Sequence, residues 1–137
     1  MRGAREWEVM REKSRENYEV AREALRVNRP NAAANRFYYA LYLAIIVELE
    51  KEQGRMPQHY NVSERTVDDE GEWPHKTLVY RASRDAGLND SEMALVAEVH
   101  GQRVIADYKP FNAHRELLRF YEPRIRGLLE ALGVLST

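Results

Sequence analysis

Residues 32–49 read AAANRFYYALYLAIIVEL, the most apolar stretch of the chain. Its polar side chains are limited to Asn35, Arg36 and Glu48, so a helix formed by it is apolar on nearly every side. Such a helix belongs at the centre of a bundle. A membrane span is excluded because charged residues both interrupt the stretch and follow it immediately. We therefore predict a central helix here, with Gly54 as its C-cap.

The residues before this stretch predict a second helix. From residue 4 to about residue 28, small or apolar residues recur at steps of three and four in a charged background, which places them on one helical face. This stripe consists of Trp7, Met10, Ser14, Tyr18, Ala21 and Leu25. Arg29-Pro30-Asn31 ends the pattern, because proline disfavours helix at the residue before it. We expect Asn31 to cap the central helix.

The residues after the central helix begin with a predicted loop. Residues 54–72 have weak periodicity and contain Pro57 and five acidic residues, and loops of this length are often functional or mobile. Those acids are Glu64, Asp68, Asp69, Glu70 and Glu72. A third helix is predicted over residues 73–86, with Pro74 at its first helical position, Gly87 as its stop, and an apolar side. That side consists of Leu78, Val79 and Ala82.

Two more helices complete the predicted fold. Capping residues and acids at 89–92 start a helix that ends near Tyr108, before Lys109-Pro110. Its buried side comprises Met93, Val96, Val99 or His100, and Ala106. The last helix, over about 112–132, must bend or restart at Pro123. Its stripe comprises Leu117, Leu118, Tyr121, Ile125, Leu128, Leu129 and Leu132. With no strand-like alternation, the sequence predicts an all-α, up-and-down bundle of about five helices.

Composition restricts the class of protein further. The chain has 137 residues, 21 basic and 22 acidic side chains and no cysteine. This length suits one domain over residues 1–137. The lack of cysteine excludes disulfides, cysteine-bound zinc, iron–sulfur clusters and thiol catalysis. A net charge of -1 gives no global attraction for nucleic acid, so any polyanion site must be local. Because neither a signal peptide nor a membrane span is evident, we expect a cytoplasmic protein.

Several common chemistries lack their motifs in this sequence. None of the histidines, His59, His75, His100 and His114, lies i, i+4 from another, so we expect no metal centre. The glycine-rich phosphate loop of P-loop enzymes and the Gly-x-Ser-x-Gly elbow of serine hydrolases are both absent. We expect no cofactor.

Polar residues within two apolar helices form the candidate site. The candidate ligand-binding residues are Asn35, Arg36, Tyr39, Asp107 and Tyr108, together with Arg103. Arg103 and Asp107 share a helix face at i, i+4, and we expect Arg36 to reach Asp107 across the bundle. One interpretation is a buried network of ion pairs and tyrosine hydroxyls that fixes helix register. The other is a groove in which an arginine holds a phosphate and a tyrosine stacks on a base.

At these residues the sequence resembles the HEPN family (higher eukaryotes and prokaryotes nucleotide-binding), in its small stand-alone prokaryotic branch. The stretch from Asn31 to Tyr42, NAAANRFYYALY, is similar to that branch's second helix, with small residues, an arginine and paired tyrosines. Pro74-His75-Lys76-Thr77 and Arg103 followed by Ala106-Asp107-Tyr108 support the resemblance, in the same order along most of the chain.

The resemblance implies a bundle of four to five helices that often forms homodimers and is frequently encoded beside a minimal nucleotidyltransferase, as a toxin–antitoxin pair. Active members are metal-independent ribonucleases whose motif is an arginine followed, after four to six residues, by a histidine at the dimer seam. This chain carries Tyr108 at that position. A phenol with an ordinary pKa of about 10 is a poor general base at neutral pH, where an imidazole near 6.5 is well matched.

Three functions remain open from the sequence. The first is a HEPN-like domain that binds nucleotide or RNA phosphate, or docks a nucleotidyltransferase, without efficient catalysis. The second is a metal-independent ribonuclease toxin with a rearranged catalytic site of Arg103, His100 and His75. The third is a purely structural partner subunit.

Homodimerisation is a separate expectation. Packing the other helices around one apolar helix leaves several aromatic side chains competing for cover, and an uncovered patch normally marks a partner surface. The aromatic residues in question are Trp7, Trp73, Phe111 and Phe120.

Overall fold

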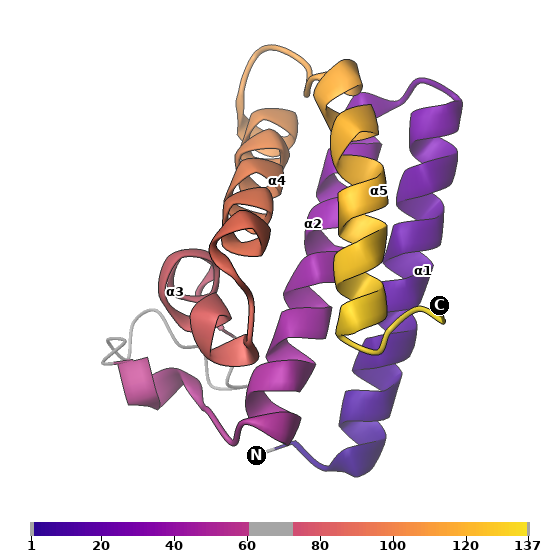
Figure 1. Ribbon diagram of the computed structural model, residues 1–137. Helices are drawn as coiled ribbons and strands as arrows, with labels where there is room; N and C mark the ends of the chain where they lie inside the picture. Colours follow the sequence, from indigo (N-terminus) through magenta and orange to yellow (C-terminus); the bar gives the residue numbers. More distant parts are fainter. Residues whose placement is uncertain (1, 61–72, 137) are drawn as a thin grey trace.

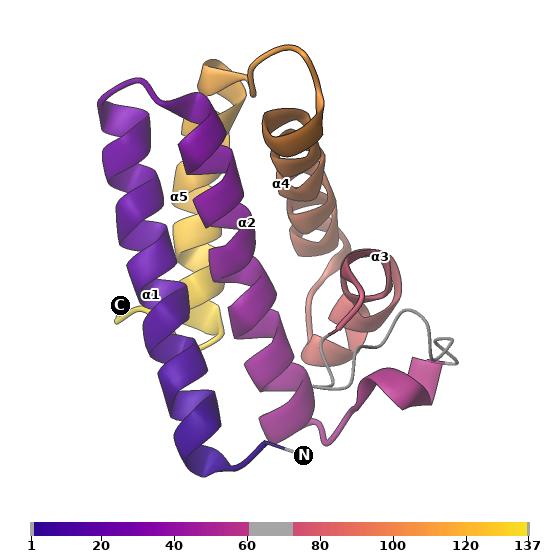
Figure 2. The ribbon, with the colours of Figure 1, turned by 180° about the vertical axis from the view of Figure 1, so that it is seen from behind.

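The computed structural model describes residues 2–60 and 73–136. Within them the chain forms five α-helices and no strand, which confirms the predicted all-α bundle. In chain order the helices are α1 (Ala4–Arg26), α2 (Pro30–Val47), α3 (His75–Thr77), α4 (Asp90–Tyr108) and α5 (Arg115–Ala131). Figures 1 and 2 place α2 between α1 and α4, with α5 packed beside α1 and α2.

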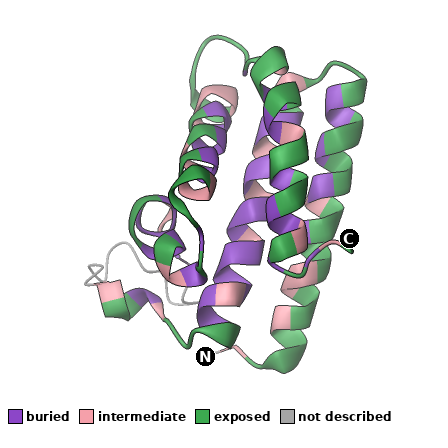
Figure 3. Ribbon diagram, in the orientation of Figure 1, coloured by how far each residue is buried: buried purple, intermediate pink, exposed green. Residues whose placement is uncertain are grey.

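Helix α2 forms the buried centre of the bundle, as its sequence predicts. Phe37, Leu41 and Ile45 have no exposed surface, and Figure 3 shows burial concentrated on α2 and on the faces turned towards it. The stripe of α1 packs here too. Its one polar member, Ser14, is accommodated because its hydroxyl donates to the carbonyl of Ala40 at 2.6 Å. A buried hydroxyl with a hydrogen-bond partner avoids most of the cost of losing water.

The start of α2 differs from the prediction. Arg29 is the N-cap and Pro30 occupies the first turn, where its missing N–H costs nothing, so Asn31 lies inside the helix and does not cap it. Its side chain instead makes tertiary contacts. The amide oxygen of Asn31 accepts from the backbone N–H of Ala113 at 2.8 Å, and its amide nitrogen donates to Asn112 at 2.9 Å. Asn31 therefore ties α2 to the segment that leads into α5.

A π-helical turn, η1 (Glu48–Glu52), continues α2 and carries a buried carboxylate. The Glu50 side chain accepts from the indole N–H of Trp7 at 3.1 Å and of Trp73 at 2.8 Å, and it pairs with Arg2. A buried carboxylate is tolerated when it is paired and hydrogen-bonded. This junction joins the start of α1 to the segment that precedes α3.

The aromatic residues expected to lack cover fall into two groups. That expectation is wrong for Trp73, which is 1% exposed. Its indole N–H donates to Glu50, and its backbone carbonyl accepts from the Tyr42 hydroxyl at 2.7 Å. Trp7 is partly covered. Phe111 and Phe120 remain exposed.

The third helical segment is uninterrupted along the chain, but its type of helix changes from turn to turn. After α3 the chain passes through a π-helical turn, η3 (Leu78–Ala82), and a 3-10 turn, η4 (Ser83–Ala86). Pro74 is the N-cap and not the first helical residue, because its backbone is extended, so α3 starts at His75, one residue later than predicted. Gly87 ends the segment as predicted, with a φ of 89° that favours glycine. The predicted apolar side, Leu78, Val79 and Ala82, is buried.

Helix α4 starts as predicted, since Asn89 and Glu92 form a capping box. Helix α5 starts later than predicted, at Arg115, where the His114 side chain accepts from the backbone N–H of Leu117. Of the two alternatives predicted at Pro123, a bend or a restart, the restart does not occur, because α5 runs through this residue. Pro123 lies on the exposed face of α5. Proline has no backbone N–H, and on this face water can donate to the backbone carbonyl that is left without a donor. Leu117 is exposed, unlike the rest of the predicted stripe.

Only part of the predicted loop over residues 54–72 is described. Gly54 has a φ of 62° just after the π-helical turn, consistent with its predicted capping role, and η2 (Pro57–Tyr60) is a 3-10 turn. The acidic residues of the loop lie outside the described residues. No helix in the described part of the chain is long and apolar enough to cross a membrane.

Candidate functional site

Polar and aromatic side chains converge between α2, α3 and α4. We call this set the seam cluster; it consists of Asn35, Tyr38, Tyr39, Tyr42, His75, His100, Arg103, Asp107 and the bordering Tyr80 and Tyr108. The α2 members are spaced at i, i+3, i+4 and i+7, and three α4 members, His100, Arg103 and Asp107, at i, i+3 and i+7, so each helix presents one polar face. His75 reaches the cluster because it opens α3.

Arg103 lies at the centre of the seam cluster and is 9% exposed. Its Nε atom lies 2.9 Å from a carboxylate oxygen of Asp107, and one terminal nitrogen donates to the Tyr39 hydroxyl at 3.2 Å. The guanidinium carbon is 5.5–5.6 Å from the ring centres of Tyr38, Tyr39 and Tyr108. A weakly hydrated guanidinium stacks well on aromatic faces. The predicted i, i+4 pair is therefore present and holds the cation in a defined position.

The two histidines of the cluster lie close together, with ring centres 6.4 Å apart. Burial is the main cause that lowers the pKa of both His75 and His100, and the positive charge of Arg103 lowers the pKa of each further. Both imidazoles are therefore neutral near pH 7.

A hydrogen bond of 2.6 Å joins the Tyr38 hydroxyl to Nδ1 of His75. Burial raises the pKa of Tyr38 well above its ordinary value, so its hydroxyl keeps its proton and is the donor. His75 then accepts at Nδ1 and carries its own proton on Nε2. This arrangement fixes both the tautomer and the orientation of the imidazole.

The partner of Asp107 on α2 is Asn35 rather than Arg36. The Asn35 amide lies 3.2 Å from a carboxylate oxygen of Asp107, whereas Arg36 donates to Asn17 of α1 at 3.2 Å. The expectation that Arg36 reaches Asp107 is wrong. Adjacent helical residues point about 100° apart, so only one of the two can face α4. Arg36 is exposed on the α1 side of α2 and lies outside the cluster.

The open edge of the cluster is aromatic. Tyr108 is 70% exposed while its ring lies beside Arg103, and Tyr80 is 56% exposed with its ring edge towards His100, their centres 6.1 Å apart. Beside Arg103, the exposed groups are the Tyr108 ring and the partly exposed carboxylate of Asp107. The sequence identified Tyr108 as a stacking surface, but it did not identify Tyr80.

Three tyrosines of the cluster were missed by sequence reasoning: Tyr38, Tyr42 and Tyr80. Tyr38 and Tyr42 are spaced i, i+4 with Tyr39 between them, and that spacing shows that they share a helix face with Asn35. The contact of Tyr80 with His100 depends on how the third helical segment docks against α4, so no local sequence pattern predicts it.

The arrangement combines a fixed cation with two neutral imidazoles. A guanidinium can hold a phosphate through paired hydrogen bonds, and a neutral imidazole can move a proton near neutral pH. Among the described residues, no group of three or more His, Asp or Glu side chains is placed to hold a metal ion.

Comparisons with known proteins find no match to this chain. No protein-family model matches the chain, and no curated protein or solved structure matches it.

Proposed function

We propose that this protein is a cytoplasmic HEPN-like domain that binds the phosphate of a nucleotide or RNA at the seam cluster, without efficient catalysis. The observation that carries the proposal is the position of Arg103, held between Asp107 and three tyrosine rings at the centre of a cluster with two histidines. The aromatic edge supplies stacking surfaces for bases, which are worth about 1–3 kcal/mol each.

Asp107 determines how a phosphate enters. Its carboxylate lies 2.9 Å from Nε of Arg103, and its side chain is 28% exposed. An incoming phosphate must displace or share this carboxylate to bind Arg103. The neighbouring Asn35 amide keeps a hydrogen bond to Asp107 and can steady it during that exchange.

A metal-independent ribonuclease is the second candidate. The observation that favours it is the proximity of two neutral imidazoles to Arg103, because a neutral imidazole can take the proton of an RNA 2′-hydroxyl and, once protonated, give that proton to the leaving group. In this alternative, His100 and His75 replace the histidine that the family motif has near the position of Tyr108.

The proposal includes assembly. We expect a homodimer, with a minimal nucleotidyltransferase as a further possible partner, because Phe111 and Phe120 remain uncovered on the surface. Light scattering at micromolar concentration should show a species near twice the chain mass of 16.0 kDa. A purely structural subunit would also dimerise, so RNA binding distinguishes the two functions.

The decisive experiment incubates the purified protein with a mixed pool of RNA oligonucleotides in EDTA. We expect filter retention of intact RNA by the wild-type protein and loss of retention by Arg103→Ala, with circular dichroism as the check of fold. Arg36→Ala is the matched control, because it removes the same charge from α2 on the side that faces α1.

Each outcome separates the candidates. Cleavage that disappears in Arg103→Ala and in His75→Gln establishes the ribonuclease. If the protein neither retains nor cleaves RNA, a structural subunit is the remaining function and the proposal is overturned. Equal loss of retention in Arg36→Ala and Arg103→Ala places the binding surface outside the seam cluster.

A further inference from the structure

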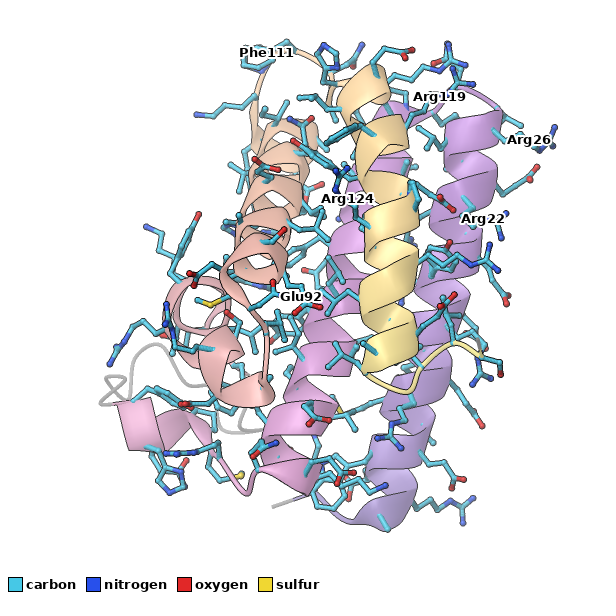
Figure 4. The ribbon with its side chains drawn as sticks, viewed as in Figure 1. Arg22, Arg26, Glu92, Phe111, Arg119 and Arg124 are labelled. Atoms are coloured by element: carbon cyan, nitrogen blue, oxygen red, sulfur yellow. The ribbon has the colours of Figure 1, made fainter. Side chains whose placement is uncertain are left out.

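A second polar site lies between α1 and α5, away from the seam cluster. A cavity of about 430 Å³ is lined by residues of both helices, which we call the α1–α5 cleft: Arg22, Leu25, Arg26, Arg119 and Glu122. Figure 4 shows Arg22, Arg26 and Arg119 along the α1 and α5 side of the bundle, whereas Arg124 lies towards α4. Three guanidinium groups from two helices therefore face one cavity.

One wall of the cleft is rigid. The buried Tyr18 hydroxyl donates to a carboxylate oxygen of Glu122 at 2.7 Å, and Arg22 Nε lies 3.2 Å from the same oxygen. The Arg22 guanidinium carbon also lies 5.7 Å from the Tyr18 ring centre. Burial raises the pKa of Tyr18 well above its ordinary value, so its hydroxyl stays a donor. This network holds Glu122 in place and brings Arg22, whose side chain is 52% exposed, to the wall of the cleft.

The other arginines of the cleft are free to rearrange. Arg26 pairs with Glu23, and Arg119 lies 3.8 Å from Glu116, and both arginine side chains are more than half exposed. Exposed pairs of this kind contribute little free energy. An oxyanion with several oxygens can replace both pairs, because guanidinium groups bind phosphate through two parallel hydrogen bonds.

We propose that the α1–α5 cleft binds a phosphate monoester in its dianionic form. The lining carries three positive charges and one negative charge, which favours two negative charges on the ligand over the single charge of a phosphodiester. Leu25 contacts the carbon side of the ester, and Glu122 accepts from a hydroxyl group there. This site is independent of the seam cluster and of the proposed RNA binding.

Side-chain NMR of the arginine Nε–Hε groups tests the proposal, with methyl phosphate as the monoester and dimethyl phosphate as the diester. We expect saturable shifts of the Arg22 and Arg119 signals with methyl phosphate at pH 7.5 and far weaker shifts with dimethyl phosphate. The affinity should fall below about pH 6, where the dianion of a phosphate monoester takes up a proton and becomes a monoanion.

Two variants of α5 give a matched comparison. Arg119→Gln should weaken methyl phosphate binding about tenfold, the effect of losing one charge-assisted hydrogen-bond pair. Arg124→Gln removes the same charge from the same helix but outside the cleft, and it should leave binding unchanged. Linear, non-saturating shifts, equal effects of the two variants, or equal binding of the diester would each overturn the proposal. Stronger shifts with an RNA oligonucleotide than with methyl phosphate would assign the cleft to nucleic acid instead.

Discussion

The two arginine sites of this protein differ in how their cations are held. Arg103 in the seam cluster is almost fully buried and is held by an acid on its own helix and by three aromatic rings. The arginines of the α1–α5 cleft are about half exposed or more, and their acid partners lie mostly on the surface. The same side chain therefore serves two purposes: packing and positioning in the seam, and exchangeable charge in the cleft.

This difference has an energetic meaning. Removing a buried cation leaves its acid partner and its packing surfaces unsatisfied, whereas removing an exposed one returns its partner to water. A ligand at the seam must compete with Asp107 beside a buried cation, while a ligand at the cleft replaces the exposed pairs that Arg26 and Arg119 make with Glu23 and Glu116. We therefore expect mutations at the seam to affect stability first, and mutations at the cleft to affect binding alone.

The largest effect should come from Arg103→Ala. We expect it to lower the free energy of unfolding by about 3 kcal/mol, because it removes a largely buried cation from its carboxylate partner and from its contacts with the tyrosine rings. Arg119→Ala should change stability by less than about 0.5 kcal/mol, as is usual for an exposed residue. Urea denaturation of both variants measures the contrast, and similar losses in the two would remove the distinction between the sites.

Tyr38→Phe should have the next largest effect. Removing the hydroxyl that donates to Nδ1 of His75 should cost about 1 kcal/mol of unfolding free energy. The pKa of His75 should rise at the same time, because the lost hydrogen bond favours the neutral imidazole. An NMR titration of the histidine ring protons reports the pKa, with Tyr80→Phe as the control. An unchanged His75 pKa would show that burial and Arg103 alone set it.

Asp107→Asn tests whether the Asp107 carboxylate competes with a ligand for Arg103. With the competing carboxylate gone, we expect the seam cluster to bind RNA oligonucleotides about three- to fivefold more tightly, equivalent to less than about 1 kcal/mol. Glu116→Gln on α5 removes the same charge away from the seam and should leave RNA affinity unchanged. Weaker RNA binding by Asp107→Asn would indicate that Asp107 positions Arg103 for the ligand instead of competing with it.

The smallest effect is a pH dependence. Burial and Arg103 lower the pKa of His75 and His100 in the folded protein, so the unfolded chain binds these two protons more readily. Their contribution to stability is complete above the ordinary histidine pKa of about 6.5 and is lost as the pH falls from there to the lowered folded-state values. The urea midpoint of unfolding should decrease as the pH is lowered from 7.5 to 5.5. The double variant His75→Gln, His100→Gln should make the midpoint less dependent on pH. A midpoint independent of pH in the wild type contradicts this.

The sequence predicts the fold well because each helix carries its own periodic stripe. The apolar run of α2 places it at the centre of the bundle, and the capping box at Asn89 and Glu92 marks the start of α4. The i, i+4 pair of Arg103 and Asp107 is also a local property of one helix. Its presence follows from spacing alone.

The parts that the sequence does not predict depend on how helices rotate and dock. Asn35 and Arg36 are adjacent, and only the rotation of α2 against α4 decides which of them meets Asp107. His75 joins the seam cluster because the irregular third segment docks beside α2. Asn31 caps no helix because Pro30 takes the first turn and frees its side chain for contacts across the bundle.

The junction at Glu50 also gives the protein an optical label. The chain has two tryptophans, and both donate their indole N–H to this one carboxylate. Intrinsic fluorescence therefore reports on a single corner, where the start of α1 meets the end of α2, and the cleft arginines lie towards the other end of the bundle (Figure 4). Emission that changes before the far-ultraviolet circular dichroism signal during unfolding would show that this corner opens first.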